Sequence, residues 1–328
     1  MQVIIPLAGK GTRLRPHTHL TPKPMLKVAG RPVMDWVMDR LQGIDVTELI
    51  FITGHLKEQV EQFAREHYRI PSRFIEQKVQ DGTAGAINLA RPYVKGPVLI
   101  IFVDTVFEAD LTLINRTDAD GIIWAKEVED YQRFGVVVTD KEGYMTRIVE
   151  KPSTPISKLA NIGLYYIRSV DSLWKGIDHV LANPANKGEW YLTDAFQWMI
   201  EHGKRILTAE VGGWYDCGKL DTLLETNEIL LRNGAARKRE FPGVTIHDPV
   251  YIEDGVTIER SEIGPNVSLE TGSSISGSKL RNTIVGKGAK LTNVKLDDSL
   301  LGNRVTVEGL RGSTTLGDDS EVTAERSS

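Results

Sequence analysis

Cysteine is nearly absent from this sequence, which carries a single one, Cys217, among its 328 residues. One cysteine excludes an intrachain disulfide framework and a cysteine-rich zinc site. Long apolar runs are also missing: none approaches the ~18–20 residues of a membrane-spanning helix. The run Val3–Leu7 is shorter than the apolar core of a secretion signal, and no basic stretch precedes it. We therefore expect a cytoplasmic protein that does not bind a membrane.

A large excess of one charge is missing as well. The chain has 44 acidic and 40 basic residues, a net charge of −4. A broad basic surface for nucleic acid is thus not expected, and an anionic ligand would need a local cluster of cations. Apolar residues make up 41% of the chain, which is enough to form a real core. At about 100–200 residues per domain, this length predicts two domains.

Residues 1–235 alternate short aliphatic runs with amphipathic segments. Helical stripes cross residues 33–41 and 60–64, and a long helix is predicted over Leu220–Arg232. This alternation predicts an α/β domain with a mixed, mostly parallel sheet covered by helices, in which ligands bind beyond the carboxyl ends of the strands. The predicted strands are Val3–Leu7, Leu49–Thr53, Arg73–Gln77, Val98–Val103, Gly121–Ala125, Gly135–Thr139 and Gly163–Ile167.

Residues 240–328 lose this helical pattern and gain a six-residue repeat. Aliphatic residues recur at Ile263, Leu269 and Ile275, and similar short registers follow. A hexad places one inward residue on each face of a triangular parallel β-helix, which we favour over a small β-sandwich of short strands. The register breaks near Asn282 and Asp297-Asp298, where we expect irregular corners. β-Helices often pack against their own copies, so a homo-oligomer is a candidate assembly.

A glycine-rich loop, Gly9–Pro16, directly follows the first predicted strand. Its two glycines permit a turn that aims backbone N–H groups at an anion, and Arg13 and Arg15 can hold phosphate oxygens. Lys23 adds a cation on a proline-stiffened stretch. Leu14 stands where a dinucleotide fingerprint needs a third small residue, and the ending of a P-loop is missing. Dehydrogenases and P-loop NTPases are therefore disfavoured, while an ordinary tight turn stays the simplest alternative for the loop alone.

The run Gly9–Thr18, followed by Pro22–Met25, resembles the signature of the sugar-1-phosphate nucleotidyltransferases, or NDP-sugar pyrophosphorylases. The resemblance is greatest to the glucose-1-phosphate uridylyl- and thymidylyltransferases. It implies a Rossmann-like nucleotidyltransferase domain over residues 1–235, a left-handed β-helix over 240–328, a nucleoside triphosphate, a sugar 1-phosphate and Mg²⁺. In such a transfer the sugar phosphate attacks the α-phosphate in line and pyrophosphate leaves, so positioning and charge neutralisation dominate.

Two aspartates are candidate ligands for the metal. Asp104 follows a buried strand, although Val103 stands where the family usually has glycine, and Asp216 lies in a Trp-x-Asp-x-Gly segment that resembles the family's. Taken alone, each is more typical of a turn or cap. The resemblance implies a catalytic set of Arg13, Lys23, Asp104, Lys151 and Asp216.

The nucleotide is predicted to lie against the front loop, by which we mean residues 9–25, and against the segment after the third strand. The Gln77 amide can pair with a pyrimidine edge, and Gly82 opens a helix with its backbone accessible. Resemblance to uridylyl and thymidylyl members implies UTP or dTTP. The nucleotide-binding candidates are Leu7, Ala8, Gly9, Gly11, Thr12, Arg13, Gln77, Gly82, Thr83 and Asp104.

The sugar phosphate is predicted from short segments that match the family. Glu150 would accept hydrogen bonds from sugar hydroxyls, and Lys151 would bind the phosphate. The alternative without a functional role is a surface ion pair between these two residues. The candidates for binding the sugar phosphate are Gly135, Glu150, Lys151, Asn161, Gly163, Glu189 and Trp214.

Two other functions compete with this one. A bifunctional enzyme would add acyl transfer on the β-helix, but His247 is the sole histidine there to act as a base. A non-catalytic nucleotide-sugar sensor would not need two metal carboxylates. His17 and His19 form a weak metal motif and are predicted to be solvated loop residues, and Cys217 is predicted to be a small buried hydrophobe.

Overall fold

The computed structural model describes residues 1–186 and 188–324, and its packing divides the chain into two compact units. Unit 1 comprises Met1–Gly9 and Val37–Trp214, and unit 2 comprises Lys10–Trp36 and Tyr215–Ser328. The predicted domains, residues 1–235 and 240–328, are a division by sequence pattern and stay a prediction. The two compact units have different boundaries from these domains, because the front segment Lys10–Trp36 packs with the tail.

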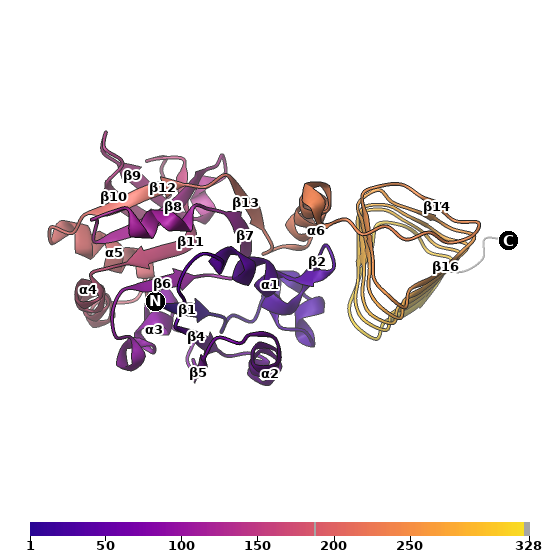
Figure 1. Cartoon of the computed structure of the whole chain (residues 1–328), viewed down its shortest axis with the longest axis horizontal. Coiled ribbons are helices and arrows are strands. Elements are labelled where there is room, and N and C mark those ends of the chain that lie inside the picture. Colours follow the sequence, from indigo (N-terminus) through magenta and orange to yellow (C-terminus); the bar gives the residue numbers. More distant parts are fainter. Residues whose placement is uncertain (187, 325–328) are drawn as a thin grey trace. The chain divides into compact units, whose positions relative to one another are not determined.

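Unit 1 is built around a nine-stranded mixed sheet with the path β10-β9-β11-β6-β1-β4-β5, in which β8 pairs with β11 and β12 (Figure 1). The strands are β1 (Gln2–Pro6), β4 (Glu48–Thr53), β5 (Ser72–Glu76), β6 (Val98–Ile101), β8 (Gly121–Glu127), β9 (Gly135–Thr139), β10 (Met145–Glu150), β11 (Leu159–Ile167) and β12 (Ile206–Glu210). Strands β5, β4, β1 and β6 are parallel, whereas β11 runs antiparallel to β6 and β8. This sheet confirms the predicted Rossmann-like fold class.

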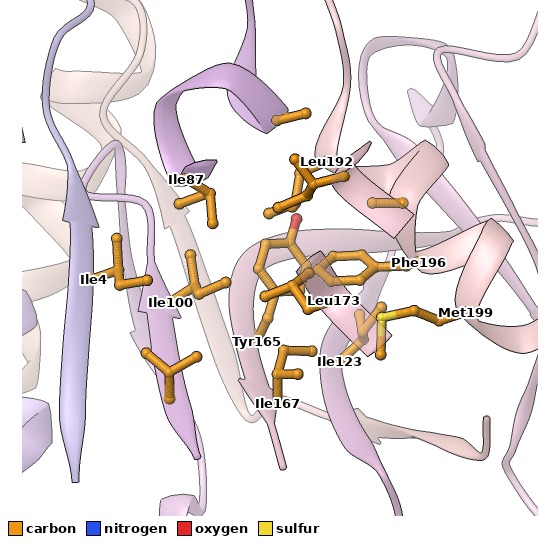
Figure 2. Packing of buried hydrophobic residues seen from close by; sticks show 14 of the residues in the cluster. Ile4, Ile87, Ile100, Ile123, Tyr165, Ile167, Leu173, Leu192, Phe196 and Met199 are labelled. Atoms are coloured by element: carbon orange, nitrogen blue, oxygen red, sulfur yellow. The ribbon is translucent and has the colours of Figure 1, made fainter. Parts of the chain in front are cut away.

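Helices pack on this sheet and enclose its core. They are α2 (Lys57–His67), α3 (Thr83–Asn88), α4 (Val170–Ala182) and α5 (Leu192–Glu201), and α1 (Val33–Met38) crosses the boundary between the units. Every residue of β6 is fully buried, which explains its unbroken apolar sequence. Figure 2 shows Ile4 next to Ile100 in the sheet, and Tyr165 of the sheet next to Phe196 of α5. Each such aliphatic or aromatic side chain contributes about 1.5–3 kcal/mol by its burial.

Short elements complete the chain. They are β2 (Lys27–Val28), β3 (Arg31–Pro32), β7 (Thr105–Glu108), β13 (Gly213–Asp216), α6 (Leu220–Leu230), and the single turns η1 (Thr12–Leu14), η2 (His17–His19), η3 (Lys23–Met25), η4 (Asp39–Leu41), η5 (Arg91–Tyr93), η6 (Leu111–Asn115), η7 (Tyr131–Arg133) and η8 (Leu231–Ala235). Within the ranges that the structure describes, no helix has the length and apolar character needed to cross a membrane.

The tail of unit 2 forms a triangular coil of three parallel five-stranded sheets, the predicted left-handed β-helix (Figure 1). The first sheet contains β14 (Thr245–Ile246), β17 (Glu262–Ile263), β20 (Lys279–Leu280), β23 (Lys295–Leu296) and β26 (Arg311–Gly312). The second contains β15 (Val250–Ile252), β18 (Val267–Leu269), β21 (Thr283–Val285), β24 (Ser299–Leu301) and β27 (Thr315–Leu316). The third contains β16 (Thr257–Glu259), β19 (Ser274–Ser276), β22 (Lys290–Thr292), β25 (Thr306–Glu308) and β28 (Glu321–Thr323).

Aliphatic side chains stack inside this coil from one turn to the next. Ile263 pairs with Leu280 and Leu280 with Leu296, so each turn takes up roughly three hexads. The breaks in the repeat are corners: Asn282 and Asp298 adopt positive φ angles of 42° and 46°. Asn and Asp tolerate this conformation better than most residues. The predicted β-helix is therefore confirmed, and the breaks in its six-residue repeat lie at corners of the coil.

Candidate active site

The turn after β1 is held by its neighbours at the carboxyl edge of the sheet. The Leu7 amide donates to the Ile52 carbonyl at 2.7 Å, and the Gln80 side-chain amide donates to the Ala8 carbonyl at 2.7 Å. Gly54 lies so close that a Cβ on it would stand 2.7 Å from the Ala8 carbonyl oxygen. The predicted nucleotide residues Leu7 and Ala8 are thus fixed in place, and Gln80 is a contact that sequence reasoning missed.

Gln77 follows β5 and is nearly buried, with 8% of its surface exposed. Its backbone amide donates to the Thr53 carbonyl at 2.8 Å, so it continues the ladder between β5 and β4. Its side-chain Nε2 donates to Asp81 Oδ1 at 2.9 Å and reaches the Gly82 carbonyl at 3.4 Å. With both amide hydrogens directed to the protein, Gln77 presents its Oε1 acceptor. This arrangement suits a donor such as the imide N–H of a pyrimidine.

The start of α3 is tied to the segment before α5. Gly82 has a φ of 112°, and a Cβ there would stand 2.4 Å from the Trp190 carbonyl oxygen, so glycine is required. The Ala84 amide donates to that same carbonyl at 2.9 Å. The Thr83 hydroxyl accepts from the Leu192 amide at 2.8 Å. Through these bonds the predicted nucleotide residues Gly82 and Thr83 lie beside the segment that carries Glu189.

Three predicted sugar residues from three strands converge at one point. Gly135 opens β9, Glu150 ends β10, and Asn161 lies in β11. A Cβ on Gly135 would stand 2.2 Å from Asn161 Nδ2 and 2.8 Å from Glu150 Oε2. The absence of a side chain at Gly135 therefore lets the amide and the carboxylate meet over its backbone.

The Asn161 amide is oriented by a network of hydrogen bonds. Its Nδ2 donates to the Gly135 carbonyl at 2.8 Å. Its Oδ1 accepts from the Gly163 amide at 3.3 Å and from the Tyr165 hydroxyl. Tyr165 is a functional candidate that the sequence analysis missed. Burial raises the pKa of Tyr165 well above its usual value, so the hydroxyl stays protonated and acts as the donor.

Glu150 is a largely buried carboxylate beside two partners. The Thr193 hydroxyl donates to its Oε2 at 3.1 Å, and Lys151 Nζ lies 3.7 Å from its Oε1. Burial raises the pKa of Glu150, while Lys151 and the Thr193 hydroxyl oppose that rise. Lys151 itself is half exposed, with Nζ 5.0 Å from the centre of the Tyr191 ring. Lys151 therefore places a cation at the surface of the site, and the Glu150 carboxylate places a hydrogen-bond acceptor beneath it.

Glu189 and Trp214 complete the predicted sugar set in unit 1. Glu189 is exposed, and its backbone exchanges hydrogen bonds of 3.0 and 3.1 Å with Asn186. The Trp214 ring lies edge-on to Phe134, 4.9 Å between centroids at 71°. Its Nε1 is buried without a hydrogen-bond partner among the described residues. An indole donor beside Phe134-Gly135 suits an oxygen-rich ligand at this edge.

Asp104 comes shortly after β6, whose end is anchored by a 2.8 Å bond from the Phe102 amide to the Gly163 carbonyl. The Asp104 carboxylate acts on the Tyr165 hydroxyl, because it contributes to the raised pKa of that group. The predicted metal ligand of unit 1 is thus close enough to the Asn161 network for its charge to act on Tyr165.

In unit 2 the front loop is closed around Gly11. This residue has a φ of 61°, and its carbonyl accepts from the Thr18 hydroxyl at 2.8 Å. A Cβ on Gly11 would stand 3.1 Å from the Cβ of Lys23. The loop therefore folds back on itself and brings Lys23 beside the glycine turn.

The cationic side of the loop faces solvent. Leu14 is fully buried, whereas Thr12 and Arg13 in η1 are exposed, and Gly9 before it is exposed as well. Arg13 lies beside the segment after β13, since its Nη2 would be 3.3 Å from a Cβ on Gly218. Arg13 and Lys23, two of the predicted catalytic cations, therefore both lie in the front loop.

Asp216 ends β13 and shapes the turn that follows. Its Oδ1 accepts from the Gly218 amide at 2.7 Å, and its carbonyl accepts from the Thr226 hydroxyl at 2.9 Å. Unit 2 therefore brings together Arg13 and the Asp216–Gly218 turn. Cys217 is buried at 2% exposure, as predicted for a small hydrophobe.

The prediction that His17 is a solvated loop residue is wrong. Its side chain is buried, and burial lowers its pKa to about 4, while Asp318 acts in the opposite direction. His19 is exposed, as predicted. Among residues 1–186 and 188–324, no group of three His, Cys, Asp or Glu side chains is arranged to hold a metal ion.

A family model described as nucleotidyl transferase matches residues 2–233 of the chain. The chain therefore belongs to the nucleotidyl transferase family. Within it, the signature loop and the β-helix tail are those of the sugar-1-phosphate nucleotidyltransferases, and the protein is an enzyme of this class.

Relatives and solved structures agree with this family. The chain is 33% identical to a bifunctional protein GlmU of Methanococcus aeolicus, across 92% of this chain and 77% of that protein. It is 30% identical to the UTP–glucose-1-phosphate uridylyltransferase AglF of Haloferax volcanii, across 65% of this chain and 89% of that protein. A crystal structure of UDP-glucose pyrophosphorylase complexed with UDP-glucose superimposes with a TM-score of 0.64 at 22% identity, covering 71% of this chain and 98% of that one. This last similarity shows the fold.

Proposed function

We propose that the protein transfers a nucleotidyl group from UTP or dTTP to a sugar 1-phosphate, with glucose 1-phosphate as the expected acceptor. An oxygen of the sugar phosphate forms a bond to the α-phosphorus, and the bond to the bridging oxygen of the β-phosphate breaks. The products are an NDP-sugar and pyrophosphate. The name of the AglF relative, a UTP–glucose-1-phosphate uridylyltransferase, supports this pair of substrates.

The observation that carries the proposal is the convergence of Gly135, Glu150 and Asn161 from three strands, with Lys151 next to them. A hexose needs such mixed donors and acceptors for its hydroxyls, and its phosphate needs an adjacent cation. The Lys151 ammonium is placed at the surface of this cluster, 3.7 Å from the Glu150 carboxylate. It would bind the attacking phosphate without deep burial of its charge.

The triphosphate is assigned to the front loop and the edge near Gln77. Arg13 and Lys23 would bind the β- and γ-phosphates and stabilise the leaving pyrophosphate. The Gln77 Oε1 atom would accept from the imide N–H that uracil and thymine share. Uracil and thymine differ by one methyl group, which contributes only about 1–3 kcal/mol of discrimination.

Asp104 and Asp216 are the proposed ligands of Mg²⁺. Carboxylate oxygens shortly after β6 and at the end of β13 fit a hard cation that keeps several waters. When bound, the ion would neutralise charge on the α-phosphate. Asp104 belongs to unit 1 and Asp216 to unit 2, and the proposal is that both bind the same ion.

One assay tests the function as a whole. Purified protein is mixed with each nucleoside triphosphate and each of several sugar 1-phosphates, with Mg²⁺, and pyrophosphate release is measured. We expect release with UTP or dTTP together with glucose 1-phosphate. If no pair releases pyrophosphate, the non-catalytic sensor replaces the enzyme.

Lys151→Ala tests the sugar-phosphate assignment. Loss of the cation should raise the KM for sugar 1-phosphate roughly 10–100-fold and leave the KM for the triphosphate near that of the wild type, since charge-assisted bonds contribute about 1.5–3 kcal/mol. The matched control is Lys158→Ala, because Lys158 is a half-exposed lysine paired with Glu129 at 2.6 Å. Equal KM values in the two variants would remove Lys151 from the site.

The name of the bifunctional relative keeps acyl transfer as a second candidate. His247 in the tail is exposed and lies 3.0 Å from a Glu262 carboxylate oxygen, which would orient its ring as a general base. Consumption of acyl-coenzyme A by the wild type, lost in His247→Gln, would establish this activity.

A further inference from the structure

The three outer faces of the β-helix are not equivalent. On the first sheet the outward positions are charged, at Glu262, Lys279, Lys295 and Arg311. On the three middle strands of the second sheet, β18, β21 and β24, the outward positions are Ser268, Ile284 and Leu300, and they are only 1%, 3% and 5% exposed. Their neighbours Val267, Leu269, Val285 and Leu301 fill the interior of the coil. The second face is thus a docking face, and α6 packs against its strands β21 and β24.

The front segment Lys10–Trp36 belongs to the same compact unit as this face. One anchor is an ion pair: Lys27 Nζ lies 2.9 Å from Glu270 Oε2 and 3.9 Å from Glu253 Oε2. The Glu270 side chain is 11% exposed, so the charges meet largely out of water. A pair in this environment is held firmly, since separating the partners would leave a buried charge uncompensated.

Backbone contacts extend the same anchor. The Ala29 amide donates to Asn227 Oδ1 at 2.8 Å, and the Ser268 hydroxyl of the docking face donates to that same atom at 2.7 Å. Asn227 is fully buried in α6. Gly30 faces the Tyr251 ring so closely that a Cβ would stand 2.1 Å from it. These contacts fix the position of the backbone at Ala29 and Gly30 relative to the β-helix.

A second anchor lies at the far end of the β-helix. A Cβ on Gly317 would stand 2.9 Å from the Pro16 ring, so the loop rests on the coil at a glycine. His17 is buried there, and the negative charge of Asp318 acts to raise the pKa of its ring against the larger, opposite effect of burial. Pro16 and Lys27 are thus both fixed to the β-helix, and Lys23 lies on the stretch between them.

We propose that Lys27 is a positioning residue: its ion pair with Glu270 uses the β-helix to hold the segment that presents Arg13 and Lys23 to the triphosphate. This inference rests on the proposed function of those two cations. It gives the tail a part in the nucleotidyl transfer itself, because a displacement of the loop by about 1 Å would cost much of the rate.

Kinetics of Glu270→Gln and Lys27→Met test the proposal. We expect the KM for the triphosphate to rise at least about tenfold in both, with the KM for sugar 1-phosphate unchanged, and Lys27→Arg to recover most of the loss. The matched control is Asp297→Asn, which breaks an exposed ion pair with Arg281 on the same coil. A purely structural pair would lower the melting temperature and the active fraction but leave both KM values unchanged, and this result would overturn the proposal.

Hydrogen–deuterium exchange provides a readout that does not depend on catalysis. Glu270→Gln should speed exchange across residues 10–26 at least about tenfold relative to wild type, whereas Asp297→Asn should not. If the wild-type protein releases no pyrophosphate with any substrate pair, the proposed function fails, and the exchange result still reports whether the ion pair holds the loop. Unchanged exchange in Glu270→Gln would reject the positioning role in either case.

Discussion

At the scale of single residues, Asn161 shows how a neutral amide acquires one chemical role. Its oxygen accepts from Tyr165 and Gly163, and one amide hydrogen is committed to the Gly135 carbonyl. The second amide hydrogen of Asn161 is the donor that would bind a ligand. Next to it, Glu150 offers an acceptor. A sugar hydroxyl placed between them would accept from the amide and donate to the carboxylate, which fixes its orientation.

Tyr165→Phe tests that arrangement. The substitution removes the hydroxyl that orients Asn161, and the phenyl ring still fills the core seen in Figure 2. We expect the KM for sugar 1-phosphate to rise about 5–10-fold, the effect of one hydrogen bond of about 1 kcal/mol, with the KM for the triphosphate unchanged. Tyr166→Phe is the control, since Tyr166 is a neighbouring buried tyrosine in β11. Identical kinetics of the two variants would contradict the orienting role.

His17 gives a prediction about pH. Burial lowers its pKa from 6.5 to about 4, so the unfolded chain binds a proton in this range and the folded chain does not. Stability is therefore fully present above pH 6.5 and falls as the pH drops toward 4, by at most about 3 kcal/mol. In urea unfolding between pH 7.5 and 4.5, His17→Gln should lose less stability than the wild type. His19→Gln, at an exposed position, should behave as the wild type does.

At the scale of elements, the sequence predicted most of what forms the sheet. Each of the seven predicted strands is present, because aliphatic runs that end at Gly, Pro or Asp have few alternatives to a buried strand. Strands β10 and β12 of the sheet were missed, and β10 carries a register shift between Met145 and Arg147 that interrupts the alternation of its side chains. Burial of His17 was missed because the neighbouring Pro16 packs against Gly317, some three hundred residues away in sequence.

The docking face of the β-helix makes an element-scale prediction. Leu300 points outward from β24 yet is buried, in a strand against which α6 packs. Leu300→Asp should destabilise unit 2 by at least about 3 kcal/mol, because it buries an unpaired carboxylate without disturbing the interior of the coil. Lys295→Asp, at an outward position of the exposed first sheet, should change stability by less than about 0.5 kcal/mol. Urea unfolding of both variants is the measurement, and similar losses would mean that the two faces do not differ.

At the scale of the whole molecule, the signature loop is divided between two units. Leu7–Gly9 follows the first strand and belongs to unit 1, while Lys10 and the rest of the loop belong to unit 2. A sequence pattern cannot reveal this, because the motif is continuous and the division follows from packing on a distant coil. What the sequence does contain is the set of residue types, a cationic loop and two isolated aspartates, that nucleotidyl transfer needs.

The two aspartates make the prediction that involves both units. If Asp104 and Asp216 bind one Mg²⁺, Asp104→Asn and Asp216→Asn should each lower metal-dependent kcat by about 10²–10³-fold, and the double variant should be little worse than either single one. Two independent roles would instead multiply the losses. Chelation by EDTA should abolish pyrophosphate release in the wild type, and Mg²⁺ should restore it. Asp178→Asn, which breaks an exposed pair with Arg91, is the control for a lost carboxylate. Fully multiplicative losses in the double variant would separate the two carboxylates and remove the shared ion from the mechanism.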